Sequence, residues 1–187
     1  MTSEKMDRRV RKTRSLLLQG LIQLMQEKDV KDISVKELSD LVDINRGTFY
    51  LHYNDIYDML HKIEEELFQE FHEILDRRLV NETLVDSPKE ILLDIFVFLE
   101  RNHDLAKVMM GPHGDLAFTN HLKNLVKERS KHVLEKAHAS EYSEYLPSFI
   151  VSGCVGVIET WLNHPNPLPA KDMAELCSRL LSHGLSV

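Results

Sequence analysis

Apolar residues recur at helical spacing along almost the whole chain. One stripe at i, i+3 and i+4 positions runs from Val10 to Met25, and another runs from Ile56 to Ile74. No run of alternating apolar and polar residues is bounded by hairpin-turn signals, so strands are not expected. The pattern therefore predicts an all-α protein of about nine helices.

Helix-start and turn signals divide the chain further. In DSPKE, Ser87 suits an N-cap, Pro88 the first helical position and Glu90 the far end of a capping box. A long helix from residue 55 to about 79 precedes this break. We expect a small N-terminal domain, residues 1–53, and a larger domain, residues 54–187, that begins with this helix.

The stretch SVKELSDLVDINRGTFYLHYNDIYDML, residues 34–60, contains two short helices around a tight polar break. Ser34 followed by Glu37 is a capping box, which places a helix start at residue 35. Asn45 can cap the second helix. Asp43 falls where the chain must turn sharply, and Asp tolerates left-handed backbone better than most residues. The arrangement is that of a helix-turn-helix.

The second of these helices divides into an inner and an outer face. Phe49 and Tyr53 lie four residues apart and are expected to point inward. Thr48, Tyr50 and His52 are left outside, and such side chains can donate to phosphate oxygens or reach base edges in a major groove. Tyr and His also cover apolar surface well, so a purely structural helix pair is the alternative.

Charge is unevenly distributed along the chain. The formal net charge is −7, but residues 1–53 hold ten Lys/Arg against eight Asp/Glu. A basic cluster opens the first helix and could supply phosphate contacts, although a solvated terminus would look the same. Its members are Lys5, Arg8, Arg9, Arg11, Lys12 and Arg14.

At this point a family resemblance emerges. RGTFYLHYNDIYDML is similar to the glycine-threonine-aromatic-tyrosine core of TetR-family transcriptional regulators, preceded at the right distance by SVKELSDLV. The resemblance implies a homodimer that binds double-stranded DNA at a pseudo-palindromic operator, most often as a repressor that responds to a small-molecule effector, with no cofactor. The candidate DNA-binding residues that follow are Ser34, Lys36, Asn45, Arg46, Gly47, Thr48, Tyr50, Leu51 and His52.

One departure from the family pattern leaves a second function open. The family commonly has a phosphate-contacting lysine at the start of the fourth helix, where this chain has Ile56 between Asp55 and Asp58. Backbone N–H groups could replace that contact. The alternative is a TetR-like co-regulator that acts through protein–protein contacts. LPSFIVSGCVGVIETWLNHP also resembles a Gram-positive branch that includes a regulator associated with dihydroxyacetone kinase.

In the C-terminal two-thirds, the resemblance implies a helical interface between two copies and an effector pocket. Small residues in SGCVGVIETWL would let helices approach closely, although they could equally fit an internal core. The expected interface residues are Ser152, Gly153, Gly156, Trp161, Leu176 and Leu180. The expected pocket residues are Phe98, His103, Met109, Met110, His113, Phe118, Phe149 and Trp161.

Other protein classes have little support in the sequence. Cys154 and Cys177 are too few for a disulfide scaffold and are expected to be reduced core thiols. HEILD, residues 72–76, lacks the second histidine of the zincin pattern, so neither a metal site nor an enzyme is expected. No apolar stretch is expected to approach the roughly 18 residues that span a bilayer. We therefore expect a cytoplasmic protein without membrane association.

Overall fold

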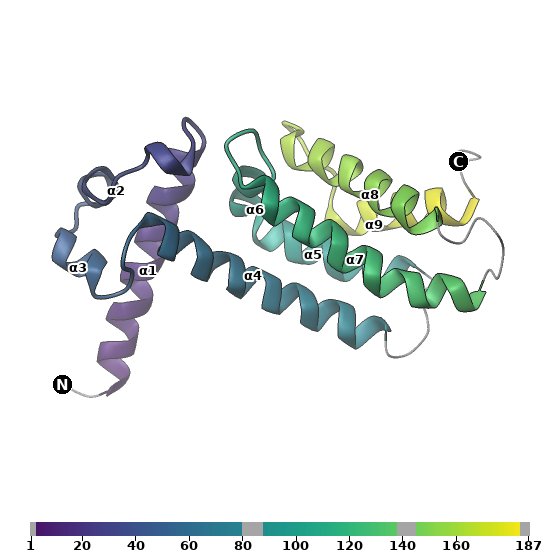
Figure 1. Cartoon of the computed structure of the whole chain (residues 1–187), viewed down its shortest axis with the longest axis horizontal. Helices are drawn as coiled ribbons and strands as arrows, with labels where there is room; N and C mark the ends of the chain where they lie inside the picture. The colour runs from purple at the N-terminus through teal and green to yellow at the C-terminus, as the bar shows by residue number, and fades with distance from the viewer. Residues whose placement is uncertain (1–2, 80–87, 138–144, 184–187) are drawn as a thin grey trace. The chain divides into compact units, whose positions relative to one another are not determined.

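The computed structural model describes residues 3–79, 88–137 and 145–183 (Figure 1). Within these ranges the chain forms nine α-helices and one short 3-10 helix, and no strand. The prediction of an all-α fold of about nine helices is confirmed. The expected N-cap, Ser87, lies outside the described residues, and Pro88 is itself the N-cap of the helix that follows.

The helices alternate with short connections. The four N-terminal α-helices are α1 (Ser3–Met25), α2 (Val35–Leu41), α3 (Arg46–Tyr50) and α4 (Ile56–Leu79), with the 3-10 helix η1 (Val30–Asp32) after α1. The remaining five are α5 (Lys89–Arg101), α6 (His103–Met109), α7 (Leu116–Ala137), α8 (Leu146–Asn163) and α9 (Ala170–His183).

The chain divides into two compact units. The first contains residues 1–65 together with the loop 111–114, and the second contains residues 66–110 and 115–187. The division falls inside α4, whereas the expected domain boundary was residue 53. Ile56, Met59 and Ile63 of α4 are buried and belong to the first unit, because an amphipathic helix buries its apolar stripe wherever neighbouring helices cover it.

In the first unit, α1 and α2 approach closely at Gly20. A Cβ atom built on Gly20 would lie 2.4 Å from Cγ1 of Val42 and 2.8 Å from Cδ1 of Leu38. After α2 the chain turns at Asp43, whose φ of 52° is in the left-handed region, as its position in the turn predicted. The Ile44 N–H then donates to the Ser39 carbonyl oxygen over 3.0 Å.

The apolar stripe of α1 is not buried in the first part of the helix. Val10 is 37% exposed, and the buried residues of the helix begin at Leu17. Arg8, Arg9 and Lys12 in the same turns are also exposed. The expectation that Val10 shares the buried face is therefore wrong, because the helix extends beyond the residues that cover its later turns.

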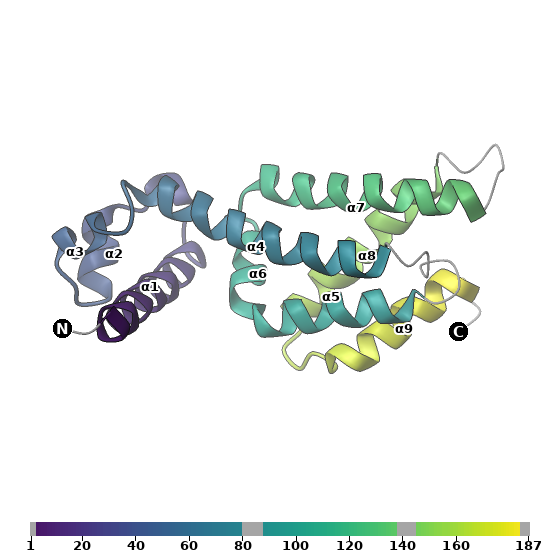
Figure 2. The ribbon, with the colours of Figure 1, turned by 90° about the horizontal axis from the view of Figure 1, so that it is seen from below.

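The second unit is a helical bundle with one continuous core. In it, α5 packs along α9, as Figure 2 shows, and α7 packs along α8. Trp161 of α8 anchors the core: its ring meets Phe96 edge-on with centroids 5.3 Å apart, and its Nε1–H donates to the Leu168 carbonyl oxygen over 2.7 Å. A buried indole with its one donor satisfied contributes apolar area without an unpaired polar group.

Replacing Gly20 with valine should destabilise the first unit. The new side chain has no room beside Val42 and Leu38, and overpacking of this kind costs about 1–3 kcal/mol. Urea denaturation of the full chain, followed by far-UV circular dichroism, measures the loss. Fluorescence of Trp161, the chain's single tryptophan, reports the second unit and should be unchanged. Gln19→Ala, at the exposed neighbouring position, should shift stability by less than about 0.5 kcal/mol, and an equal effect of both variants would contradict the close approach.

Candidate functional site

Both helices of the helix-turn-helix begin at a capped residue. The Ser34 hydroxyl oxygen accepts from the Glu37 N–H over 3.1 Å, and the Asn45 carboxamide oxygen accepts from the Gly47 N–H over 2.7 Å. A cap satisfies one of the backbone donors that a helix start leaves unpaired. The amide group of Asn45 and the hydroxyl hydrogen of Ser34 remain as possible donors to another molecule.

The short helix α3 presents two different faces. Phe49 is fully buried and Tyr53, just beyond the helix, is 4% exposed, which confirms the prediction that both point inward. Tyr50 is 58% exposed although its ring meets Phe49 edge-on, and Leu51 is 81% exposed. Of the residues predicted to bind DNA, Ser34, Lys36, Asn45, Arg46, Gly47, Tyr50 and Leu51 are exposed, and Thr48 and His52 are half-buried.

Two cations fix the end of α3 inside the first unit. Arg14 donates from Nε to the Tyr53 hydroxyl oxygen over 3.2 Å. The Lys62 ammonium donates to the His52 carbonyl oxygen over 3.3 Å and to Asp58 over 2.9 Å, and it lies 5.4 Å from the centre of the Tyr53 ring. Arg14, expected among the phosphate-contacting cluster, therefore has a partner within the fold that the sequence did not reveal.

The start of α4 differs from the family pattern in a way that the structure explains. Ile56 is 4% exposed, so this position is part of the core. The Asp58 N–H donates to Asp55 over 2.8 Å, and the Asn54 N–H donates to Asp58 over 2.8 Å. The hydrogen bond from Lys62 and then that from Asn54 lower the pKa of Asp58, so this carboxylate stays ionised. These two N–H groups are therefore already occupied by carboxylates.

His113 belongs to the first unit, through the loop 111–114. Its Nδ1 lies 2.8 Å from a carboxylate oxygen of Asp29, and the other oxygen of Asp29 pairs with Lys31 over 3.0 Å. The hydrogen bond with His113, followed by that with Lys31, lowers the pKa of Asp29. Among the described residues, no group of three or more His, Cys, Asp or Glu side chains is arranged to hold a metal ion.

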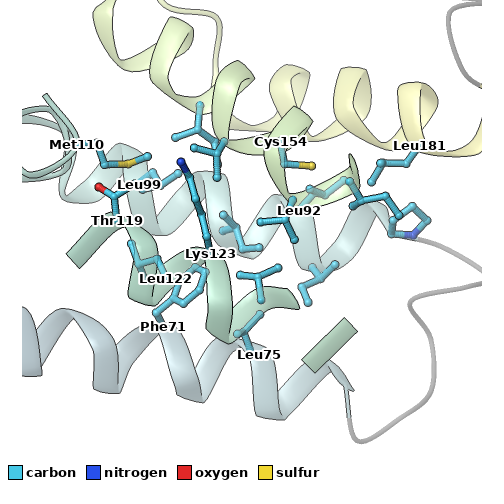
Figure 3. A pocket seen from close by; sticks show the side chains of 18 residues that line it. Phe71, Leu75, Leu92, Leu99, Met110, Thr119, Leu122, Lys123, Cys154 and Leu181 are labelled. Carbon is cyan, nitrogen blue, oxygen red and sulfur yellow. The ribbon is translucent and has the colours of Figure 1, made fainter. Parts of the chain in front are cut away.

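The second unit contains a partly open cavity of about 140 Å³ (Figure 3). Its walls come from the second half of α4 and from α5, α7 and α8, with Leu181 of α9 at one side. Among the described residues, the lining is apolar apart from Thr119 and Lys123 of α7 and the thiol of Cys154, and almost all of the surface that faces the cavity is apolar. The principal apolar residues are Phe71, Leu75, Leu92, Leu99, Met110, Leu122, Val126 and Ile158.

Of the residues predicted to form an effector pocket, Met110 lines this cavity. Phe98, Met109, Phe118 and Trp161 are buried elsewhere in the second unit, and His103 lies beside the Trp161 ring at 6.1 Å. Phe149 is 78% exposed, and His113 contacts Asp29. The cavity's own lining consists largely of aliphatic residues at core-facing positions, which in the sequence look the same as ordinary core residues.

The exposed side of α8 carries two glycines in open space. A Cβ atom added at Gly153 or Gly156 would meet no atom within 4 Å. Ser152, Gly153, Gly156, Trp161 and Leu176 line one surface groove here. Leu180, together with Gly153 and Phe149, lines a second groove beside it. All six residues predicted for an interface thus lie along these two grooves.

Helix α8 is also unusually apolar for its exposure. This helix of 18 residues is long and apolar enough to pass as a membrane span by length and composition. Of its residues 22% are fully buried, most of its other apolar residues are half-buried, and Phe149 is exposed. The expectation that no apolar stretch would approach this length is therefore corrected. In the second unit, α8 packs on α6 and α7 and carries the core residue Trp161.

Comparison with known proteins places the chain among helical transcriptional regulators. A family model of the TetR type, described as a transcriptional regulator C-terminal region, matches residues 86–183, more than half of the chain. No curated protein matches.

Solved structures similar in fold include a TetR transcriptional regulator from Streptococcus agalactiae, at 21% identity and TM-score 0.62 over 96% of this chain and 99% of that one. The fatty acid degradation regulator FadR from Bacillus halodurans has 16% identity and TM-score 0.68 over 92% and 96%. The dihydroxyacetone kinase operon activator DhaS has 16% identity and TM-score 0.52 over 90% and 93%.

The two thiols should react slowly in the folded protein. Burial raises the pKa of Cys154, and burial together with the neighbouring Cys154 raises the pKa of Cys177 to about 12. The attacking species is the thiolate, so at pH 8 Cys177 should alkylate with iodoacetamide roughly a thousandfold more slowly than in the denatured chain. Mass spectrometry of timed samples, with a guanidinium-denatured control, measures each site. Equal rates in the two states would show that Cys177 is accessible and its thiolate unperturbed.

Proposed function

The chain belongs to the TetR family of transcriptional regulators, and from this premise we propose that it is a homodimeric, ligand-responsive repressor that binds a pseudo-palindromic operator in double-stranded DNA. TetR-family regulators as a class are DNA-binding proteins, and we propose the same non-enzymatic, cytoplasmic role for this chain. The observation that carries the proposal is the geometry of α3, in which Phe49 and Tyr53 anchor the helix and leave its polar face in solvent.

The outer face of α3 has the chemistry that DNA recognition needs. Arg46 and Tyr50 are exposed and can donate to phosphate oxygens, which fixes the orientation of the helix. We propose that the half-buried Thr48 contacts base edges in a major groove and that the exposed Leu51 contacts a thymine methyl group. Arg8, Arg9 and Lys12 on α1 would add sequence-independent attraction.

Binding to DNA from around its own gene should be saturable and steeply salt-dependent. Each phosphate contact contributes about −0.9 to the slope of log affinity against log salt, so several contacts give a slope of several units. In fluorescence anisotropy, Tyr50→Phe should weaken all sequences about equally by removing a phosphate donor, and Thr48→Ala should relax sequence preference. Tyr145→Phe, at an exposed tyrosine of the second unit, is the matched control. Binding unaffected by both α3 variants would mean that α3 is not the DNA-reading helix.

A second candidate function is a co-regulator that acts through protein contacts. It is favoured by the start of α4, where Ile56 is buried and the carboxylates of Asp55 and Asp58 occupy backbone N–H groups that could otherwise meet phosphate. A protein that is folded and dimeric yet shows no DNA binding at micromolar concentration, at low or high salt, would favour this function. The structural neighbour DhaS is named an operon activator, and kinship with its branch remains a proposal.

We assign the homodimer interface to the exposed side of α8 and the adjoining side of α9. Phe149 of α8 is 78% exposed and lines an apolar groove with the half-buried Cys154 and Val157, and exposed apolar grooves of this kind mark interaction sites. Gly153 and Gly156 leave space for a partner helix to approach its backbone. A second copy of the same face would bury both glycines and the flanking Leu176 in an isologous contact.

Gly156→Arg should separate the dimer without unfolding the monomer. No atom of the same chain lies within 4 Å of the added Cβ, so the long charged side chain is tolerated internally but blocks a partner helix. Sedimentation or light scattering should show a monomer with an unchanged circular dichroism spectrum. Gln69→Arg, which adds the same charge at an exposed position of α4, should stay dimeric. A dimer that persists in Gly156→Arg would place the interface elsewhere.

We further propose that the effector binds in the cavity of the second unit. Phe71 and Leu75 of α4 line the cavity, while the first turns of the same helix belong to the first unit. A ligand that displaces these side chains would tilt α4 and change the separation of the two α3 helices in a dimer. By linkage, a ligand that weakens operator binding must itself be weakened by operator to the same degree.

A further inference from the structure

We propose that the cavity of the second unit takes a small amphipathic anion, with an apolar body inside and one anionic group held by Lys123. This inference rests on the proposed effector role of the cavity and adds to it the chemical class of the ligand. Two observations support it: the composition and size of the walls, and the placement of the single charged side chain among them.

The walls select an apolar ligand body. Leu75, Leu92, Leu99 and Leu122 face the cavity from three different helices, and Phe71 adds an aromatic surface. A polar group placed among these side chains would lose its hydrogen bonds to water without replacement. The volume of about 140 Å³ is close to that of cavities that hold one benzene molecule, which suits a body of roughly six carbon atoms.

Lys123 sets the sign of the ligand's charge. Among the described residues it is the only charged one of the lining. It is half-buried, and Thr119, four residues earlier on α7, lies on the same helix face. Figure 3 shows Thr119 and Lys123 toward the Met110 side of the cavity, away from Leu181. Within the described part of the chain, no carboxylate is paired with Lys123.

These features together disfavour cationic ligands and ligands with two anionic groups. The four-carbon stem of Lys123 forms part of the apolar wall, while its ammonium can donate to an anion at the edge. A cationic ligand would be repelled by the ammonium. A ligand with two separated anionic groups would bury one of them among leucines without a partner. A single carboxylate or phosphate at one end of the molecule satisfies both constraints.

The direct test is calorimetric binding of a carboxylate series, from butanoate to decanoate, to the full-length protein. We expect the tightest binding near hexanoate, with one molecule per chain and an affinity at least tenfold higher than that of 1-hexanol.

Lys123→Met should weaken binding of that carboxylate by roughly ten- to a hundredfold and leave binding of 1-hexanol unchanged, because it removes a charged hydrogen bond but keeps the apolar wall. Lys107→Met, outside the lining, is the charge-matched control and should change neither. Hexyl phosphate in the same assay distinguishes a phosphate from a carboxylate ligand.

Several results would overturn the ligand class. These are binding of 1-hexanol as tight as that of hexanoate, no binding by any member of the series or by hexyl phosphate, or equal carboxylate affinity in Lys123→Met and the unaltered protein. A parallel anisotropy assay with operator DNA separates this inference from the effector role. Carboxylate binding through Lys123 that leaves DNA affinity unchanged supports the ligand class and overturns the effector role. Release of DNA by an uncharged compound, with no release by the carboxylates, supports the effector role and overturns the ligand class.

Discussion

The burial of Phe49 and Tyr53 is the constraint on which the DNA-binding unit depends. A helix of five residues is too short to be stable alone, so α3 exists because these two rings are packed beneath it. Arg14 and Lys62 then hold Tyr53 and the end of α3 by hydrogen bonds and a cation–π contact. Once the inner face is fixed, Tyr50 and Leu51 must face solvent. The surface proposed to meet DNA is therefore the reverse side of a core contact.

In the second unit a buried aromatic contact also fixes the helices, but the helices leave a cavity between them. Its helices pair as α5 with α9 and α7 with α8, and the edge-on contact of Trp161 with Phe96 fixes the core near one end. Between these helices a partly open apolar cavity of about 140 Å³ remains. The stem of Lys123 forms part of its wall, and because this residue is half-buried its ammonium can reach the rim. The proposed ligand class, an amphipathic anion, rests on these apolar walls and on this one cation beside them.

Glycines lie in opposite surroundings in the two units. At Gly20 the absence of a side chain lets α1 and α2 touch, and any Cβ would collide with Val42. At Gly153 and Gly156 no atom of the same chain lies within 4 Å of an added Cβ. Each of these glycines therefore lowers helix stability by about 1 kcal/mol relative to alanine, and no close contact within the chain requires it. In the proposed homodimer, a helix of the second copy would fill this space. The proposed dimer would also cover Phe149, the exposed aromatic residue of α8.

The sequence by itself determined the features that depend on near neighbours. The caps at Ser34 and Asn45, the left-handed Asp43, the inward Phe49 and Tyr53 and the all-α fold each follow from residues a few positions apart. Only the tertiary structure decided which cation is internal, as with Arg14 and Tyr53, and which histidine joins a distant segment, as with His113 and Asp29. It also decided which apolar residues line a cavity. In the sequence, a leucine beside a void and a leucine in a filled core have the same helical spacing, because the void is formed by the packing of several helices.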